Sequence, residues 1–274
     1  MIEELAISTK NCIIQREGHT LLITLNRPEA KNAFSPSMLV GLYKAWRLLD
    51  SDDSLYCAIF TANGDCFCAG MDLKALSQGG WVDKDQEEMQ AILKEVPNMP
   101  FQALLRDNRP NKPIILAVEG YALAGGTEIL QGTDIRIGAE DAIFGVTEVA
   151  RGLYPMLGST IRLPRQIPYA LAAEVLLMGR HVTAAEALQW GLINRVVPKG
   201  QSLAEAKKCA EVINANGPLA VKAVTRSLRE HQDLAEEIAI LKSAELGQPI
   251  FSTSDAKEGL KAFKEKRKAI FIGE

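Results

Sequence analysis

The chain has 274 residues, enough for one large globular domain or for a domain with an extension. Its composition, 47% hydrophobic and 24% charged, is typical of a globular protein that can bury a substantial core. The net charge of −3 excludes a general attraction to nucleic acid or to an anionic membrane. An anionic ligand would therefore need a local basic cluster.

The N-terminus and the cysteines indicate where the protein resides. Residues 1–12 lack the basic and apolar regions of a secretory signal, and no apolar stretch is long enough to span a bilayer. Cys66 and Cys68 form a C-x-C pair, but no second Cys or His pair accompanies them. We therefore expect no metal site, reduced cysteines and a cytoplasmic protein without membrane contact.

The first part of the chain predicts a hairpin and a helix. Two β-rich runs, at 12–17 and 20–25, flank the turn residues Gly18 and His19. After a polar loop, Ser35 followed by Pro36 is a typical helix start, and an apolar face at helical spacing follows as far as residues 51–53.

Two strand–turn–helix units follow. A buried strand at 56–61 leads through a turn and small residues to Asp72, which enters a helix. Residues 76–111 begin irregularly and then show an amphipathic helix, a pattern that fits a flap, a pocket wall or a plain surface insertion. A second buried strand at 114–118 leads to Gly125, Gly126 and Glu128 at the start of another helix.

The second unit carries the first candidate site. Gly125 and Gly126 have no Cβ, so their backbone N–H groups can approach another molecule closely. Glu128 follows in the first helical turn, which places a carboxylate beside hydrogen-bond donors. The alternative is a structural role, in which the acid only complements the helix dipole.

The rest of the chain predicts one more strand, at 135–138, and then mainly helices. Residues 183–186 and 202–205 both match the capping-box pattern, and residues 216–218 end one helix and start another. A basic amphipathic helix at 255–266 comes last. This order predicts an α/β core with a helical C-terminal part.

Several motifs together resemble the enoyl-CoA hydratase/isomerase (crotonase) superfamily. They are residues 25–33 (LNRPEAKNA), 67–74 (FCAGMDLK), 121–128 (YALAGGTE), 144–152 (FGVTEVARG) and 263–271 (FKEKRKAIF). The resemblance covers essentially the whole chain, in the family's order. It implies an α/β fold, the ClpP-like crotonase spiral of ββα units, over residues 1–198, with a helical trimerisation region over 199–274.

The resemblance also implies an enzyme with a backbone oxyanion hole and two acidic residues. By motif position, the N–H groups of Met71 and Gly125 would hold the oxygen of an acyl-CoA thioester. Glu128 and Glu148 correspond to the hydratase acids. Glu148 would donate a proton to C2 and Glu128 would hold and activate water, which is enoyl-CoA hydratase chemistry.

Further residues are assigned to ligand binding by the same resemblance. The coenzyme A end of the thioester would lie near Ala30 and Ala69, with Lys31, Lys74 and a neighbouring subunit's Lys266 as possible phosphate partners. The acyl pocket is expected to include the following side chains: Met71, Leu76, Tyr154 and Pro155. Coenzyme A is part of the substrate, and no permanently bound cofactor is expected.

Alternatives remain at this stage. An enoyl-CoA isomerase, a hydroxyacyl-CoA dehydratase, and a non-catalytic acyl-CoA-binding or RNA-binding member of the superfamily share the same motifs. RNA binding would favour an extended basic stripe, whereas the dense Lys/Arg cluster lies only at the C-terminus. We expect no nucleic-acid partner and a homotrimer, with trimers pairing into hexamers.

Overall fold

Two β-sheets form the centre of the computed structural model, which describes residues 2–77 and 86–274. The seven-stranded sheet has the order β1 (Ile2–Glu4), β2 (Cys12–Glu17), β3 (Thr20–Leu25), β4 (Cys57–Ala62), β6 (Ile114–Val118), β8 (Ile135–Ala139), β11 (Arg195–Val197). The four-stranded sheet has the order β10 (Val182–Thr183), β9 (Ile143–Gly145), β7 (Tyr121–Leu123), β5 (Cys66–Cys68).

The strands from β3 to β11 pair in parallel, whereas β1, β2 and β3 pair antiparallel. The predicted hairpin at 12–25 is therefore confirmed, with Cys12 opposite Leu25. Parallel strands need crossovers, and the crossovers that leave β4, β6 and β8 first add a short strand to the other sheet. The chain runs β4–β5, β6–β7 and β8–β9, each time followed by helical turns. This repetition is the expected spiral of ββα units.

Twelve α-helices and three 3₁₀ helices are found in the described part of the chain. The α-helices are α1 (Pro36–Ser51), α2 (Leu73–Ser77), α3 (Gln86–Glu95), α4 (Met99–Ala103), α5 (Gly125–Leu130), α6 (Ser159–Gln166), α7 (Tyr169–Met178), α8 (Ala184–Gln189), α9 (Ser202–Asn214), α10 (Pro218–Glu230), α11 (Glu236–Gly247) and α12 (Ser254–Glu265). The 3₁₀ helices are η1 (Pro28–Ala30), η2 (Glu148–Arg151) and η3 (Gln248–Ser252).

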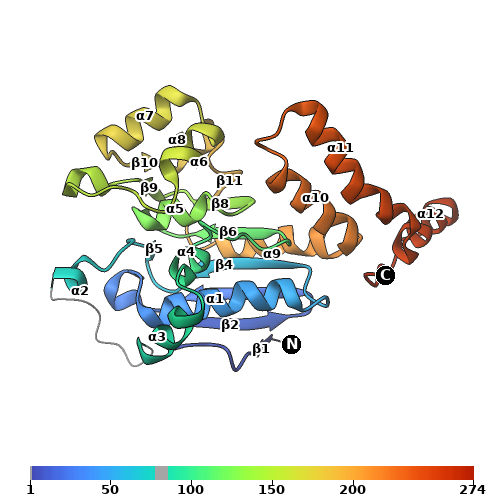
Figure 1. The fold of residues 1–274 in the computed structure, drawn as a ribbon, viewed down its shortest axis with the longest axis horizontal. Coiled ribbons are helices and arrows are strands. Elements are labelled where there is room, and N and C mark those ends of the chain that lie inside the picture. Colours follow the sequence, from blue (N-terminus) through green and yellow to red (C-terminus); the bar gives the residue numbers. More distant parts are fainter. Residues whose placement is uncertain (1, 78–85) are drawn as a thin grey trace.

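The large sheet is buried on both faces, as its continuous apolar strands predict. Ala58 and Phe60 of β4 face the main core, which also contains the apolar face of α1. Cys57 and Ile59 of the same strand face a second cluster built with α9. Figure 1 shows α10, α11 and α12 projecting from this core on the side opposite α2.

Local capping interactions set the start of α1 and of α8. Ser35 caps α1 by accepting a hydrogen bond from the Met38 N–H, and Thr183 and Glu186 form the predicted capping box of α8. The capping box predicted at 202–205 is wrong. The Ser202 hydroxyl donates to Glu119 at 2.6 Å, so this serine ties α9 to the sheet and does not cap it.

No helix in the described ranges is long and apolar enough to cross a membrane. All five cysteines are free and buried, as expected for reduced thiols. The expected domain boundary at 198/199 stays a prediction. Ala206 and Ala210 of α9, which lie beyond that boundary, pack against the large sheet.

Candidate active site

The turn between β7 and α5 places the backbone N–H of Gly125 close to the segment after β5, which carries the backbone N–H of Met71. Gly70 has a φ of +89°, and a Cβ added to it would lie 2.9 Å from the Gly125 nitrogen. The Gly70 carbonyl accepts a hydrogen bond from the Phe34 N–H at 2.8 Å. Because a trans peptide directs its C=O and N–H in opposite directions, the Met71 N–H points away from Phe34.

Both of these N–H groups are available to a ligand. Gly125 is the first residue of α5, so its N–H has no partner within the helix. Among the residues that the structure describes, neither the Gly125 nor the Met71 N–H has a hydrogen-bond acceptor. The backbone of this turn is strained, since Ala124 adopts a φ of +50°, a region that glycine occupies more readily.

Glu128 lies one turn into α5 and is almost completely buried, with 2% exposure. Its Oε1 accepts hydrogen bonds from the Leu157 N–H at 3.0 Å and the Ser159 N–H at 3.2 Å. Burial raises the pKa of Glu128, while the hydrogen bonds from Ser159 and Leu157 oppose that rise.

Glu148 begins η2 and faces Glu128, and the two carboxyl groups are close enough to share a hydrogen bond. Its Oε2 is buried and has no hydrogen-bond partner among the described residues. Burial and the charge of Glu128 together raise the pKa of Glu148 to about 7. Glu148 forms no ion pair with Arg151 or Arg162 among the described residues, so neither arginine neutralises it.

The environments of the two acids differ in one decisive way. Glu128 accepts two backbone hydrogen bonds, which favour its anionic form. The Oε2 atom of Glu148, in contrast, has no hydrogen-bond partner among the described residues. Two adjacent carboxylates cannot both ionise easily, so the pair holds one proton near neutral pH. The two N–H donors to Glu128 and the raised pKa of Glu148 favour Glu148 as the protonated member.

The residues assigned to coenzyme A fall into two groups. Ala30, Lys31 and Ala69 lie together, because the Ala69 N–H donates to the Lys31 carbonyl at 3.0 Å. Lys31 is exposed and pairs with Asp65 at 2.9 Å, while Lys74 is exposed on the short helix α2. Lys266, which ends α12, lies at the opposite end of the molecule from α2 (Figure 1).

The residues expected around the acyl group differ in their exposure to solvent. Met71 is 41% exposed and Tyr154 is 63% exposed, with its hydroxyl 3.1 Å from that of Thr160. Pro155 is buried beside this segment. Leu76 belongs to α2, but its side chain lies outside the described residues, as does Trp81.

Some residues around the glutamates were missed by sequence reasoning. Leu157, Ser159 and Gln131 belong to no recognisable motif, yet the first two hold Glu128 and Gln131 contacts Ser159. Phe34 also stands behind the N–H groups of Met71 and Gly125, 2.6 Å from where a Gly125 Cβ would be. None of these contacts has a local sequence signal, because each joins residues from separate elements.

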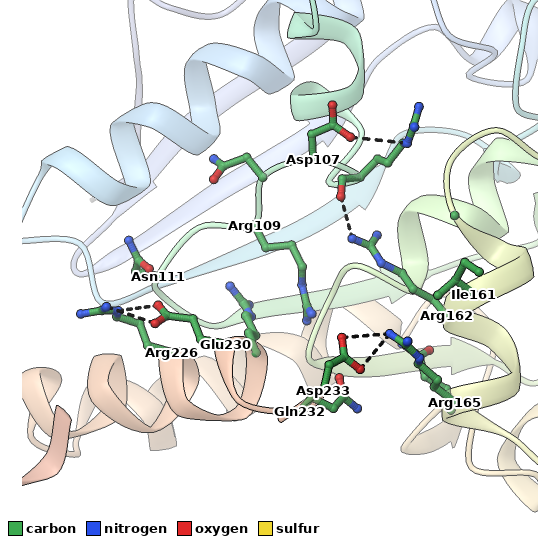
Figure 2. A pocket seen from close by; sticks show the side chains of 15 residues that line it. Asp107, Arg109, Asn111, Ile161, Arg162, Arg165, Arg226, Glu230, Gln232 and Asp233 are labelled. Atoms are coloured by element: carbon green, nitrogen blue, oxygen red, sulfur yellow. Dashed lines mark hydrogen bonds and ion pairs between the residues drawn. The ribbon is translucent and has the colours of Figure 1, made fainter. Parts of the chain in front are cut away.

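A cavity of about 390 Å³ lies near this site but does not contain the glutamates. Figure 2 shows that arginine side chains from α6, α10 and the 106–111 loop line it. Arg165 pairs with Asp233, Arg226 pairs with Glu230, and Arg162 donates to the carbonyls of Leu105 and Arg106. The Arg165 pair joins α6 to the segment after α10, the Arg162 hydrogen bonds join α6 to the segment after α4, and the Arg226 pair lies within α10. We therefore assign these three arginines a structural role.

The geometry defines an α/β protein in which two backbone N–H donors and a carboxylate pair meet at one helix. Comparison with known proteins identifies the family. Residues 15–274 match the family model for enoyl-CoA hydratase/isomerase, and the chain belongs to that family. The predicted resemblance and the predicted fold class are thereby confirmed.

Individual relatives agree with this assignment. Enoyl-CoA hydratase EchA19 of Mycobacterium tuberculosis is 49% identical over 95% of this chain and 96% of its own length. The 2,3-dehydroadipyl-CoA hydratase of Escherichia coli is 33% identical over 95% of this chain and 98% of its own. The crystal structure of an enoyl-CoA hydratase from M. tuberculosis superposes with a TM-score of 0.86 at 39% identity, covering 97% of this chain and 100% of that one.

Proposed function

We propose that this protein is an enoyl-CoA hydratase that adds water across the C2=C3 bond of a trans-2-enoyl-CoA thioester. Membership of the family implies an acyl-CoA substrate and an enzyme that works without a bound cofactor. The hydratase names of the relatives, above all the one at 49% identity, support the reaction type. The observation that supports the proposal is the buried pair Glu128 and Glu148: two backbone N–H groups donate to Glu128, and burial together with the charge of Glu128 raises the pKa of Glu148 to about 7.

In the proposed mechanism the two acids act on a single water. Glu128, as the carboxylate, takes a proton from water while the water oxygen bonds to C3. Glu148 gives its proton to C2, so the double bond becomes a C–H and a C–OH bond. The pair ends with the proton on Glu128 and the charge on Glu148. Their shared hydrogen bond then returns the proton to Glu148.

The N–H groups of Met71 and Gly125 would stabilise the intermediate. As water adds to C3, negative charge accumulates on the thioester oxygen, and two fixed donors stabilise this state more than the ground state. Losing one such donor typically costs about 3–4 kcal/mol of barrier. Both donors are backbone groups, which explains why the turn depends on backbone geometry and not on a particular side chain at position 71.

The test is a panel of trans-2-enoyl-CoA substrates of short, long and bulky acyl type, followed by loss of the conjugated thioester absorbance. Wild type should hydrate at least one substrate, and Glu148→Gln and Glu128→Gln should each lower kcat by about 10²–10⁴-fold. Product formed with no solvent oxygen incorporated would instead identify an isomerase. Activity that both variants retain in full would contradict the assignment of the acids.

We also propose a homotrimer formed through the helical C-terminal region, residues 199–274. Large apolar side chains of α10–α12 and η3 are exposed in the single chain: Leu228, Leu241, Phe251, Leu260 and Phe263. So much exposed apolar surface is unusual for a monomer. In such an assembly, Lys266 would reach the coenzyme A of a neighbouring subunit, since it is far from the site of its own chain.

A further inference from the structure

Met71, which carries one of the two proposed oxyanion donors, lies in the connection between β5 and α2, where an isolated bridge pairs it with Phe34. The other donor, Gly125, belongs to a separate element, α5. Two donors stabilise a developing charge best when both are held at fixed positions. Their relative placement therefore depends on the contacts that hold residues 69–72.

Two backbone hydrogen bonds hold the start of this connection to the loop after β3. The Ala69 N–H donates to the Lys31 carbonyl at 3.0 Å, and the Phe34 N–H donates to the Gly70 carbonyl at 2.8 Å. The Gly70 carbonyl belongs to the same peptide group as the Met71 N–H, so this group is fixed at its carbonyl end. Neither hydrogen bond acts on the residue that follows Met71.

An ion pair holds that following residue, Asp72. Arg27 Nη1 donates to Asp72 Oδ2 at 2.7 Å and to the Ala33 carbonyl at 3.2 Å. The two side chains of the pair are only 22% and 12% exposed, so solvent screens them less than it screens an ordinary surface pair. Asp72 Oδ1 accepts a hydrogen bond from the Ala75 N–H at 2.9 Å, which fixes the carboxylate at the start of α2.

Both members of the ion pair are anchored further. The N–H in the first turn of α2 and the guanidinium of Arg27 lower the pKa of Asp72 against the effect of burial, so the carboxylate stays charged. The Arg27 N–H donates to Asn32 Oδ1 at 2.7 Å, and Asn32 Nδ2 donates to the Cys66 carbonyl of β5 at 2.7 Å. Arg27 is thus tied to β5 on one side of the proposed donor and to Asp72 on the other.

We propose that Arg27, through its ion pair with Asp72, is a positioning residue that fixes the Met71 N–H relative to the Gly125 N–H. Such a role affects catalysis more than substrate binding, because a displaced donor loses most where the thioester oxygen gains negative charge. The inference rests on the proposed function, since it concerns the proposed oxyanion hole.

The experiment is a double-mutant cycle on hydration with Arg27→Met, Asp72→Asn and the two changes together. A misplacement of about 1 Å can cost 10²-fold, so each single variant should lower kcat by about 10–10²-fold. KM should change less than kcat, because the lost interaction belongs to the transition state. The double variant should lose no more than the worse single variant, since both changes break the same ion pair. Losses that multiply in the double variant would overturn the proposal.

Arg16→Met is the matched control. Arg16 also pairs with an aspartate, Asp52 at 3.0 Å, and also donates to a carbonyl, that of Gly18, but it lies at the hairpin end of β2. Its kcat should equal that of wild type, and an equal loss in Arg16→Met and Arg27→Met would contradict the proposal. Urea unfolding shows whether each variant is folded in the assay. Asp72→Asn preserves the shape of the side chain, so it tests the ion pair even if Arg27→Met does not fold.

A second measurement separates this inference from the proposed reaction. Hydrogen bonds to the oxygen of a conjugated thioester polarise it, so saturating cinnamoyl-CoA should absorb at longer wavelength when bound to wild type. This shift should be smaller in Arg27→Met and Asp72→Asn and unchanged in Arg16→Met. An equal shift in wild type and Arg27→Met, or no shift in wild type, would refute the positioning role. Absence of hydration by wild type would refute the proposed function while the shift still tests the inference.

Discussion

Glu128 and Glu148 carry the same functional group, and their different surroundings support the different roles that we propose for them. Two N–H donors hold Glu128, whereas burial beside a charge raises the pKa of Glu148 to about 7. A general acid is most useful when its pKa is close to the working pH, because it then both holds a proton and releases it readily.

The first prediction at this scale concerns pH. Glu148 must be protonated to deliver a proton to C2, so activity should be present below its pKa of about 7 and lost above it. We expect kcat to fall about tenfold per pH unit on the alkaline side, with an acid limb set by protonation of Glu128. A stopped-assay profile between pH 5 and pH 10 would measure this, and a flat alkaline side would contradict the assignment of Glu148 as the acid.

Met71 supports a second prediction. Its N–H belongs to the proposed oxyanion hole, while its flexible side chain is 41% exposed and free to line the acyl pocket. Met71→Ala keeps the N–H, so we expect the preference among acyl chains to change while the best substrate is still hydrated. Competition assays with short and long enoyl-CoA thioesters would measure the ratio of kcat/KM values. An identical preference in the variant would exclude the side chain from the pocket.

At the scale of elements, the site depends on how closely α5 approaches β5. A Cβ added to Gly126 would lie 2.4 Å from the Cys68 carbonyl oxygen, which is backbone and cannot move aside alone. The Gly70–Met71 peptide follows directly after β5, so the spacing of β5 and α5 also sets the spacing of the two N–H donors. Small residues at this junction therefore serve the packing of α5 on β5 and, in the proposed mechanism, the placement of the two N–H donors.

Gly126→Ala should accordingly damage both stability and activity. Overpacking of this kind typically costs about 1–3 kcal/mol of unfolding free energy, and displacement of α5 should lower kcat through the oxyanion donors. Gly247→Ala is the control, because a Cβ at Gly247, in α11, meets nothing within 4 Å. Urea unfolding and hydration assays on both variants would test this. Equal unfolding free energies and equal kcat values for the two variants would contradict the proposed packing of α5 against β5.

At the scale of the whole molecule, the C-terminal helices extend away from the core and leave apolar side chains exposed (Figure 1). Phe263 of α12 is 86% exposed and Leu260, one turn earlier, is 75% exposed. Burying one such side chain contributes about 1.5–3 kcal/mol, so several of them together are enough to hold subunits in a stable assembly.

We therefore expect light scattering at micromolar concentration to give at least three times the mass of one chain. Leu260→Lys and Phe263→Lys together should dissociate this assembly, because a charge would be buried without a partner. Gln232→Lys adds the same charge at an exposed loop position and should leave the mass unchanged. A monomeric wild type would refute the trimer, and with it the reach of Lys266 to a neighbouring coenzyme A.

The order of the elements was predictable from the sequence, because its signals are local. The strand at 114–118, the capped start of α1 and the capping box of α8 each depend on neighbouring residues, and the structure confirms all three. The prediction at Ser202 was wrong because a distant residue, Glu119, takes its hydroxyl. Where a long-range partner competes with a local one, the sequence pattern has no information about it.

The sequence by itself determined the family, the strand–turn–helix order and the pair of glutamates, since these follow from motifs and periodicity within short stretches. Only the tertiary structure decided that Glu128 and Glu148 face each other and that Leu157 and Ser159 hold the first of them. It also decided that α12, which Lys266 ends, lies at the opposite end of the molecule from α2. The physical reason is that burial, shared protons and donor geometry depend on residues that meet only after the sheets and helices have packed.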